Sequence, residues 1–250
     1  MKSPRTLLFD VETAPNLALV WRAWVDGKVI SIERDWYILT FAYNWLGERE
    51  VHSHALRDFK KRYRDDQTDD RDLCLKLWEL FEEADIVVSH NGNAFDIKKA
   101  NARFLYHGFN PPSPFKSVDT KQVAKRYFMF DSNSLDDLGH SLNLGGKLKH
   151  SGFEMWRGVM NNDPKAWKQM IAYNKQDVSL LKKVYDTMSS WITDHPNYNL
   201  YQGTTKNCPN CGSPKLQKRG LYLTRVKSYQ RYQCQNCGAW SHEPKSGVVR

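Results

Sequence analysis

The feature that most limits the fold is an alternation of short apolar strands with amphipathic helices along most of the chain. Residues 5–11 are strand-like, and the apolar and aromatic segments that flank Gly47 predict two further strands joined by a turn. The later segments predict, in order, a helix over 69–84, a strand over 85–90, a helix over 95–109, a strand and a helix within 116–128, and helices over 132–146 and 163–191. This order is typical of an α/β domain, a mixed sheet flanked by helices.

Several helix boundaries are marked by capping residues. Asp163 is suited to the N-cap of the longest helix and Pro164 to its first turn. Ser134 and Asp137 occupy capping-box positions. The helix over 69–84 carries the isolated Cys74, which we expect to be an inert core residue.

The composition is that of a folded protein without a membrane segment. The 250 residues are enough to bury a core, and 40% of them are hydrophobic and 13% aromatic. No apolar run reaches roughly 18 residues, so we expect no membrane span. The N-terminal segment meets acidic residues too early for a secretory signal, and a cytoplasmic location is the expectation.

The C-terminal segment differs in charge from the rest of the chain. The net charge is +9, and residues 204–250 hold nine Lys and Arg residues against the single acid Glu243. The polar residues 193–207 predict a linker, so we place domains over 1–200 and 201–250 and expect the last ten residues to be poorly ordered. Such a basic block indicates a polyanionic partner, most often nucleic acid; the alternative is a solubilising tail.

The same segment contains two C-x-x-C pairs, Cys208/Cys211 and Cys234/Cys237, separated by 22 residues. In a cytoplasmic protein such pairs indicate metal binding rather than disulfides. With two strands predicted between the pairs, the module looks like a zinc ribbon, in which four thiolates close a structural Zn²⁺ site. Its basic residues are expected to contact phosphates. They are Lys215, Lys218, Arg219, Arg225, Lys227 and Arg231.

Aromatic residues of the module have two possible roles. Tyr222, Tyr229, Tyr232 and Trp240 can stack on bases, or they can form the small core of the ribbon itself. The sequence leaves both roles open.

Acidic residues form three groups in the N-terminal 200 residues. Asp10 and Glu12 are two apart at the end of the first strand, so they project from the same face and repel each other unless a cation or proton intervenes. Asp96 begins a helix, where its charge is stabilised. Tyr173 and Asp177 are four apart on the longest helix and share one face. Taken singly, the first and third groups are equally compatible with an ordinary surface or core role, and for Asp96 alone the ordinary role of stabilising its own helix is favoured.

The order of these groups is more specific than any one of them. D-x-E on a first strand, N-x-x-x-F-D before a helix and Y-x-x-x-D on a late helix resemble the DEDD superfamily of 3′→5′ exonucleases, in the subgroup with a tyrosine in the third motif. The proofreading domain of family B DNA polymerases is similar. The resemblance covers about residues 5–190 and implies a ribonuclease H-like fold. A chain of this length is too short for polymerase domains, so the nuclease is expected to stand alone.

The resemblance also implies roles for individual residues. Asp10, Glu12, Asp96 and Asp177 would bind two Mg²⁺ or Mn²⁺ ions, Tyr173 would position the attacking water, and Asn91 and Asn93 would line the substrate cleft. Asp10 would bridge the ions, with Glu12 and Asp177 at the water-activating ion and Asp96 at the other. Carboxylate ligands suit these hard ions, and two of them activate water and stabilise the leaving oxygen. The intervening acids are expected to cap helices instead: Asp119, Asp136 and Asp137.

The leading hypothesis is therefore a metal-dependent 3′→5′ exonuclease acting on single-stranded DNA, with the ribbon gripping the substrate. A ribonuclease or a structure-specific nuclease on the same fold is the alternative within this class. An inactive scaffold that binds nucleic acid or protein belongs to another class, and the complete acidic set argues against it. A third reading has the ribbon tether the nuclease to a replication or repair protein. A bacterium or a phage-infected cell would suit such an enzyme.

Overall fold

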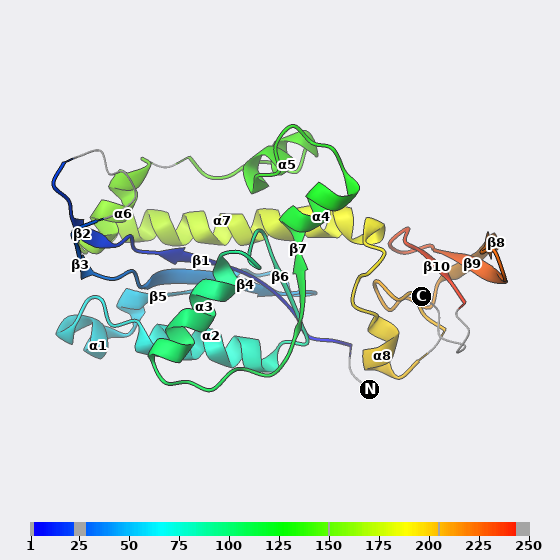
Figure 1. Ribbon diagram of the computed structural model, residues 1–250, viewed down its shortest axis with the longest axis horizontal. Coiled ribbons are helices and arrows are strands. Elements are labelled where there is room, and N and C mark those ends of the chain that lie inside the picture. The colour runs from blue at the N-terminus through cyan, green and yellow to red at the C-terminus, as the bar shows by residue number, and fades with distance from the viewer. Residues whose placement is uncertain (1–2, 23–28, 150, 205, 244–250) are drawn as a thin grey trace.

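The computed structural model describes residues 3–22, 29–149, 151–204 and 206–243. Its centre is a five-stranded sheet with the order β5–β4–β1–β6–β7 (Figure 1). The strands are β1 Thr6–Thr13, β4 Ile38–Trp45, β5 His52–Ala55, β6 Ile86–Ser89 and β7 Lys116–Asp119. Since β1 pairs antiparallel with β4 and parallel with β6, the sheet is mixed, and the predicted α/β fold is confirmed.

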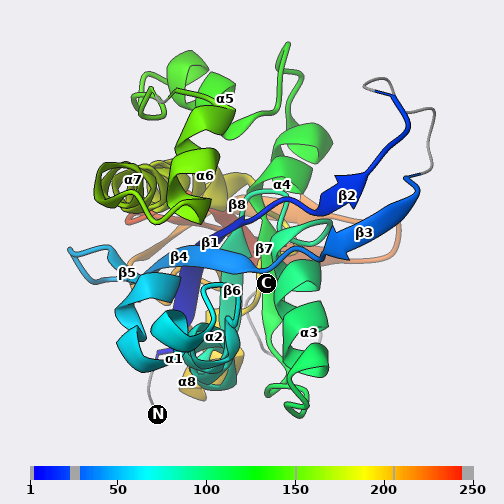
Figure 2. The same cartoon turned by 90° about the vertical axis from the view of Figure 1, so that its left-hand side faces the viewer.

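Helices cover both faces of this sheet (Figures 1 and 2). The predicted helical segments form α2 Arg71–Glu83, α3 Asp96–Tyr106, α4 Thr120–Tyr127, α5 Leu135–Ser141 and α7 Pro164–Met188. α2 and α3 lie on one face, and α7 lies along the other and contacts both β1 and β4. The structure adds elements that the sequence pattern did not indicate: β2 Leu17–Leu19, β3 Ser31–Arg34, α1 Lys60–Asp65, α6 Phe153–Met160 and α8 Tyr198–Gln202.

The alternation of side chains in β1 separates two cores. Phe9 points to α2 and meets the ring of Phe81 edge-on, with 5.0 Å between the ring centroids. Leu8 belongs to the opposite cluster, which includes Val178 and Leu181 of α7. Because residues two apart share a face, Asp10 continues the side of Leu8, toward α7.

The caps predicted at Asp163 and Ser134 are confirmed, whereas Asp136 does not cap α5 and accepts a hydrogen bond from the backbone amide of Lys147 instead. Asp163 accepts a hydrogen bond from the Lys165 amide, with Pro164 in the first turn of α7. Ser134 accepts one from the Asp137 amide at the start of α5. Cys74 is fully buried in the core, as expected.

The C-terminal cysteine module contains a three-stranded sheet in the order β10–β9–β8. The two predicted strands are β8 Leu216–Leu223 and β9 Ser228–Cys234, and β10 Trp240–His242 is an addition. Residues 244–250 lie outside the described residues, so the expected disorder of the last ten residues stays a prediction.

The connection to this module is packed rather than free. Tyr198 of α8 is buried, its hydroxyl lies 3.1 Å from the Thr6 hydroxyl, and its amide donates to the Pro209 carbonyl. The Asn210 side chain donates to the carbonyls of Ser189 and Ile192 beyond the end of α7. The division of the chain near residue 200 stays a prediction. Within the described parts of the chain, no helix is both long and apolar enough to cross a membrane.

Candidate functional site

Three of the predicted acidic side chains converge between β1 and α7. Asp10 and Glu12 project from the end of β1, and Asp177 projects from the middle of α7. Carboxylate oxygens of all three lie within 4.8 Å of one another. The convergence follows from two local periodicities, the two-residue repeat of the strand and the face of the helix that packs on it.

Asp96 lies beside this group rather than inside it. It is buried at the start of α3 and accepts a hydrogen bond from the Val11 amide at 3.3 Å. Its negative charge is nevertheless close enough to raise the pKa of Asp10. The fourth acid therefore lies near the other three, close enough to raise the pKa of Glu12 as well.

Burial raises the pKa of every one of these carboxyls. The pKa of Glu12 rises to about 8 and that of Asp96 to about 6, with burial as the main cause. The pKa values of Asp10 and Asp177 are also raised by burial, and repulsion from neighbouring carboxylates adds to the effect at Asp10. Four acids held this way require either protons or cations to offset their charge.

The structure supplies one cation that sequence reasoning missed. Lys147 extends from the loop after α5, and its ammonium group donates to Asp177 and, at 2.9 Å, to the Tyr173 hydroxyl. The loop is fixed because the Lys147 amide donates to Asp136 at 2.6 Å. Nothing in helical or strand spacing signals this contact, because it joins residues 30 apart through a loop.

Asn174 is a second residue that the sequence reading missed. It is completely buried in α7, and its amide group donates to the Asp10 carboxylate at 2.7 Å. The available signal was an amide side chain in the apolar stripe of α7, three residues before Asp177, because a buried amide needs a partner. Asn174 thus fixes the orientation of the central acid.

Tyr173 borders the acidic group, and its predicted role at the attacking water stays a prediction. Burial raises its pKa to about 12, so the hydroxyl keeps its proton at neutral pH. Its ring meets Trp156 of α6 edge-on, with 6.4 Å between centroids. A protonated, packed tyrosine is suited to orienting a neighbouring molecule and unsuited to acting as a base.

The loop that holds Asn91 and Asn93 is tightly anchored. The backbone N–H groups of both asparagines donate to the Asp119 carboxylate. Asp119 also caps α4, as expected. The Asn93 side chain accepts from Ser117 and lines a hollow next to β7 and α4. Asn91 and Asn93 do not line the pocket beside the acids, and their proposed contact with substrate stays a prediction.

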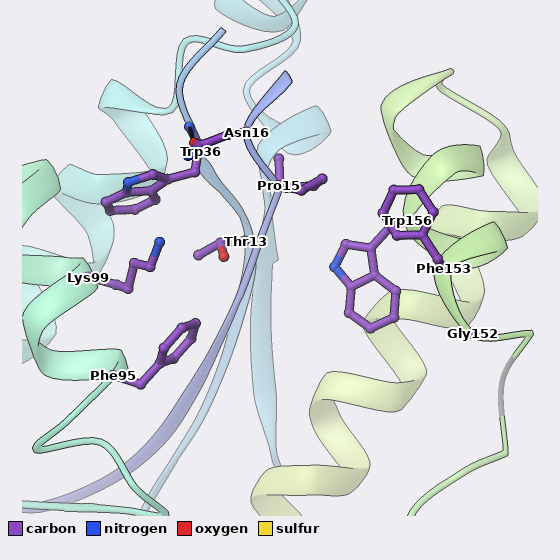
Figure 3. Close-up of a pocket in the computed structure, with 10 residues that line it drawn as sticks. Thr13, Pro15, Asn16, Trp36, Phe95, Lys99, Gly152, Phe153 and Trp156 are labelled. Carbon is purple, nitrogen blue, oxygen red and sulfur yellow. Dashed lines mark hydrogen bonds between the residues drawn. The ribbon is translucent and has the colours of Figure 1, made fainter. Parts of the chain in front are cut away.

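An aromatic pocket of about 490 Å³ adjoins the acids (Figure 3). Thr13, which follows Glu12, lies on its floor, and Phe95, which precedes Asp96, forms one wall. Trp156 and Phe153 face it from α6. Lys99 brings one ammonium group, stacked 3.5 Å above the ring of Trp36. The pocket therefore offers flat apolar surfaces within reach of the carboxylates.

The four predicted cysteines also come together. Their sulfur atoms lie within 4.8 Å of one another, with 3.7 Å between Cys208 and Cys237 and between Cys211 and Cys234. A tetrahedron with Zn–S bonds of about 2.3 Å has edges of about 3.8 Å, so the cluster fits a structural zinc site. The Asn236 side chain donates to Cys211, as expected for a thiolate.

The basic residues predicted to contact nucleic acid are all exposed on the C-terminal module, away from the acids. They are Lys215, Lys218, Arg219, Arg225, Lys227 and Arg231. Arg219 donates to the Gln233 side chain, and Arg231 donates to the Arg219 carbonyl and lies over the ring of Trp240. The structure thus separates an acidic site on the main sheet from a basic surface on the module.

Comparison with known proteins matches residues 37–189 to a family model described as the RNase H superfamily. Among solved structures, the family B DNA polymerase of the hyperthermophilic archaeon Pyrobaculum calidifontis is similar in fold, with a TM-score of 0.50 and 14% sequence identity. The match covers 90% of this chain and 31% of the polymerase chain, so the chain spans about a third of that protein's length. No curated protein matches the sequence significantly.

Proposed function

Because the chain belongs to the RNase H superfamily, we propose that it is a metal-dependent 3′→5′ exonuclease that hydrolyses phosphodiester bonds at the 3′ ends of single-stranded DNA. The observation that carries the proposal is the convergence of Asp10, Glu12 and Asp177, with Asp96 alongside. One lysine cannot balance four carboxylates, and an all-oxygen ligand set favours Mg²⁺ or Mn²⁺.

These residues could hold two metal ions. Glu12 and Asp177 would hold one ion together with Asp10, and Asp96 would help to hold the second. Two such ions activate a water molecule and stabilise the leaving oxygen. Asn174 keeps the Asp10 carboxylate in place for both.

The chain itself positions the attacking water. Tyr173 keeps its proton at neutral pH, and its hydroxyl is hydrogen-bonded to Asp177, so it lies directly beside this acid. Lys147 donates to the tyrosine oxygen, which fixes the direction of the hydroxyl proton. The tyrosine would therefore orient the water, and ions held by the acids would lower the pKa of that water.

The aromatic pocket supports action at a strand end. None of the four acids lines the pocket, but Thr13 and Phe95 in its lining are chain neighbours of Glu12 and Asp96, so a base bound there would lie near the acids. Stacking on Phe95, Trp156 or Trp36 tolerates every base, because each base has an aromatic face. A pocket of this kind favours a terminal, unpaired nucleotide and little sequence preference.

For the C-terminal module, we propose a zinc ribbon in which Cys208, Cys211, Cys234 and Cys237 bind one structural Zn²⁺. With four thiolates the coordination is complete, so the ion would hold the fold together and take no part in hydrolysis. The exposed basic residues would assist binding of the substrate. Docking of a replication or repair protein is the other role proposed for the module.

The test is digestion of 5′-labelled single-stranded DNA, duplex DNA and RNA in parallel. With Mg²⁺ or Mn²⁺, we expect mononucleotides from the 3′ end of single-stranded DNA. Asp177→Asn should lower the rate about 100-fold or more, because it removes a metal ligand. Asp186→Asn, an exposed acid on the same helix, is the matched control and should retain the rate.

Full activity of the Asp177→Asn variant would overturn the active site proposed here. Faster digestion of RNA would assign a ribonuclease on the same fold. Metal binding to the protein is measured directly by calorimetry. If the metal binds and all three substrates bind without being hydrolysed, the result would instead support an inactive scaffold.

A further inference from the structure

One face of the C-terminal sheet carries a row of aromatic and basic side chains. Tyr222 of β8 lies directly opposite Tyr229 of β9, and Arg231 of β9 lies opposite His242 of β10. Directly paired residues, and residues two apart along a strand, share a face. Trp240, two residues before His242, belongs to the same face. These five residues, Tyr222, Tyr229, Arg231, Trp240 and His242, form what we call the aromatic–basic face.

The members of this face are arranged as stacked planes. The rings of Tyr222 and His242 are stacked, with 4.4 Å between centroids and 19° between planes. The Arg231 guanidinium lies 4.9 Å from the centroid of the Trp240 ring. A backbone carbonyl of Arg219 accepts a hydrogen bond from Arg231 and holds it there. The face is therefore a preformed surface.

These aromatic side chains do not form the core of the module. That core consists of Cys208, Cys234 and Ala239, with Leu216 and the other two cysteines packed against it. Trp240 remains 51% exposed and Tyr222 44% exposed. Tyr232 points to the opposite face, the side of Cys234. Of the two roles that the sequence left open for the aromatic residues, a structural core role does not apply to Trp240 and Tyr222.

The charge around the face is mostly positive. Residues 206–243 contain seven Lys and Arg residues against one acid, Glu243, which directly follows His242. Among the described residues, none of these seven forms an ion pair. An unneutralised basic surface attracts a polyanion, and the stacked rings favour one that presents free aromatic faces.

We propose that the aromatic–basic face is a binding site for single-stranded nucleic acid, separate from the acidic site. Its rings would stack on unpaired bases while Arg231 and the neighbouring cations contact phosphates. A duplex keeps its bases stacked on each other, and an acidic peptide offers charge without base planes. That the bound strand is also the strand being hydrolysed rests on the exonuclease function proposed above.

The position of the module predicts a length requirement. From Asp177 to the end of α7 at Met188 there are eleven residues, about 16 Å along the helix axis. The module is anchored beyond that end through Asn210. At about 3.4 Å per stacked nucleotide, roughly five nucleotides are needed to cover this part of the path. A trinucleotide is too short to occupy both sites.

The experiment uses the full chain with Asp10→Asn, which prevents hydrolysis during the measurement. Fluorescence anisotropy gives the Kd for labelled dT20, dT3 and a 20-base-pair duplex. We expect Trp240→Ser to weaken binding of dT20 about tenfold, because one stacked base is lost. Trp240→Phe should restore most of the affinity, since it retains an aromatic plane. Trp191→Ser, which replaces an exposed tryptophan outside the module, is the matched control.

Three results would overturn the proposal: unchanged dT20 binding in Trp240→Ser, an equal loss for duplex and dT20, or an equal loss for dT3 and dT20. Unchanged binding in both Trp240→Ser and Tyr222→Ser would assign the face to a protein partner. The exonuclease function is tested separately by digestion with the parent protein. Selective loss of dT20 binding without any digestion would sustain this binding site and remove the proposed enzyme activity.

Discussion

Replacing Glu12 with Gln should make the metal-free protein more stable, although it removes a proposed metal ligand. Burial, and then repulsion from Asp177, raises the pKa of Glu12 from 4.5 to about 8. A group whose pKa rises on folding contributes stability below its unfolded pKa and loses that contribution as the pH rises through its folded pKa. In the metal-free protein, the stability contributed by protonated Glu12 is therefore lost as the pH rises from 4.5 to about 8.

The size of the effect follows from the same values. The difference of 3.5 between the two pKa values corresponds to about 5 kcal/mol at about 1.4 kcal/mol per unit. Glu12 is half-buried and its titration is shared with neighbouring acids, so about half of that, 2–3 kcal/mol, is the reasonable expectation. For a chain of this length, the Tm of Glu12→Gln should exceed that of the parent protein by about 5–10 °C at pH 8. At pH 5 the two should differ little.

Differential scanning calorimetry at the two pH values, with Mg²⁺ removed by dialysis, measures the effect. Glu50→Gln replaces an exposed glutamate outside the site and should follow the parent protein at both pH values. Addition of Mg²⁺ should raise the Tm of the parent protein more than that of Glu12→Gln. An identical pH dependence for parent and Glu12→Gln would refute the view that these acids repel each other in the folded protein.

Three further predictions concern the surroundings of the acids. Lys147→Met should lower the free energy of unfolding of the metal-free protein in urea by about 1–2 kcal/mol, because it leaves Asp177 without its ion-pair partner. As a control, Lys182→Met removes the more exposed ion pair with Asp186 and should change this free energy by less than about 1 kcal/mol. Burial lowers the pKa of His90 to about 4, so its imidazole is neutral and an NMR titration should show no protonation above pH 5. The neutral imidazole contributes stability that should be lost as the pH falls from 6.5 to about 4. Gly92→Ala should destabilise the protein by about 1–3 kcal/mol in the same unfolding assay, because its Cβ would lie 2.0 Å from the Ser89 hydroxyl oxygen, and Ser89→Gly should recover part of the loss.

The parts of the site that could be predicted from sequence are those that local periodicity determines. The two-residue repeat of β1 places Asp10 and Glu12 on one face, and the helical repeat of α7 places Tyr173 near Asp177. Both patterns depend on residues close together in the chain. The same holds for the cap at Asp163, which needs only the first turn of its helix.

The parts that could not be predicted depend on where loops lie in three dimensions. Lys147 reaches Asp177 across a loop, and its own strand or helix pattern contains no information about that contact. Asp119 caps a helix, as expected. It also accepts hydrogen bonds from the backbone N–H groups of Asn91 and Asn93, which lie in another loop. Periodicity describes one element at a time, and these contacts join several.

This difference has a consequence for how the site is built. The four acids lie on β1, α3 and α7, elements that are fixed by the sheet and the cores on its two faces. Lys147 lies in the segment between α5 and α6, and Phe153 and Trp156 of the pocket wall lie in α6 just after it. A single stretch of about ten residues therefore supplies a charge beside the acids and two of the four aromatic side chains that line the pocket. Under the function proposed above, substitutions at Phe153 or Trp156 would change how a nucleotide is held and leave all four proposed metal ligands in place, because none of those ligands lies in α6. Lys147 differs from these two aromatic residues, because its ammonium group contacts the proposed ligand Asp177 directly, so its replacement would affect the acids.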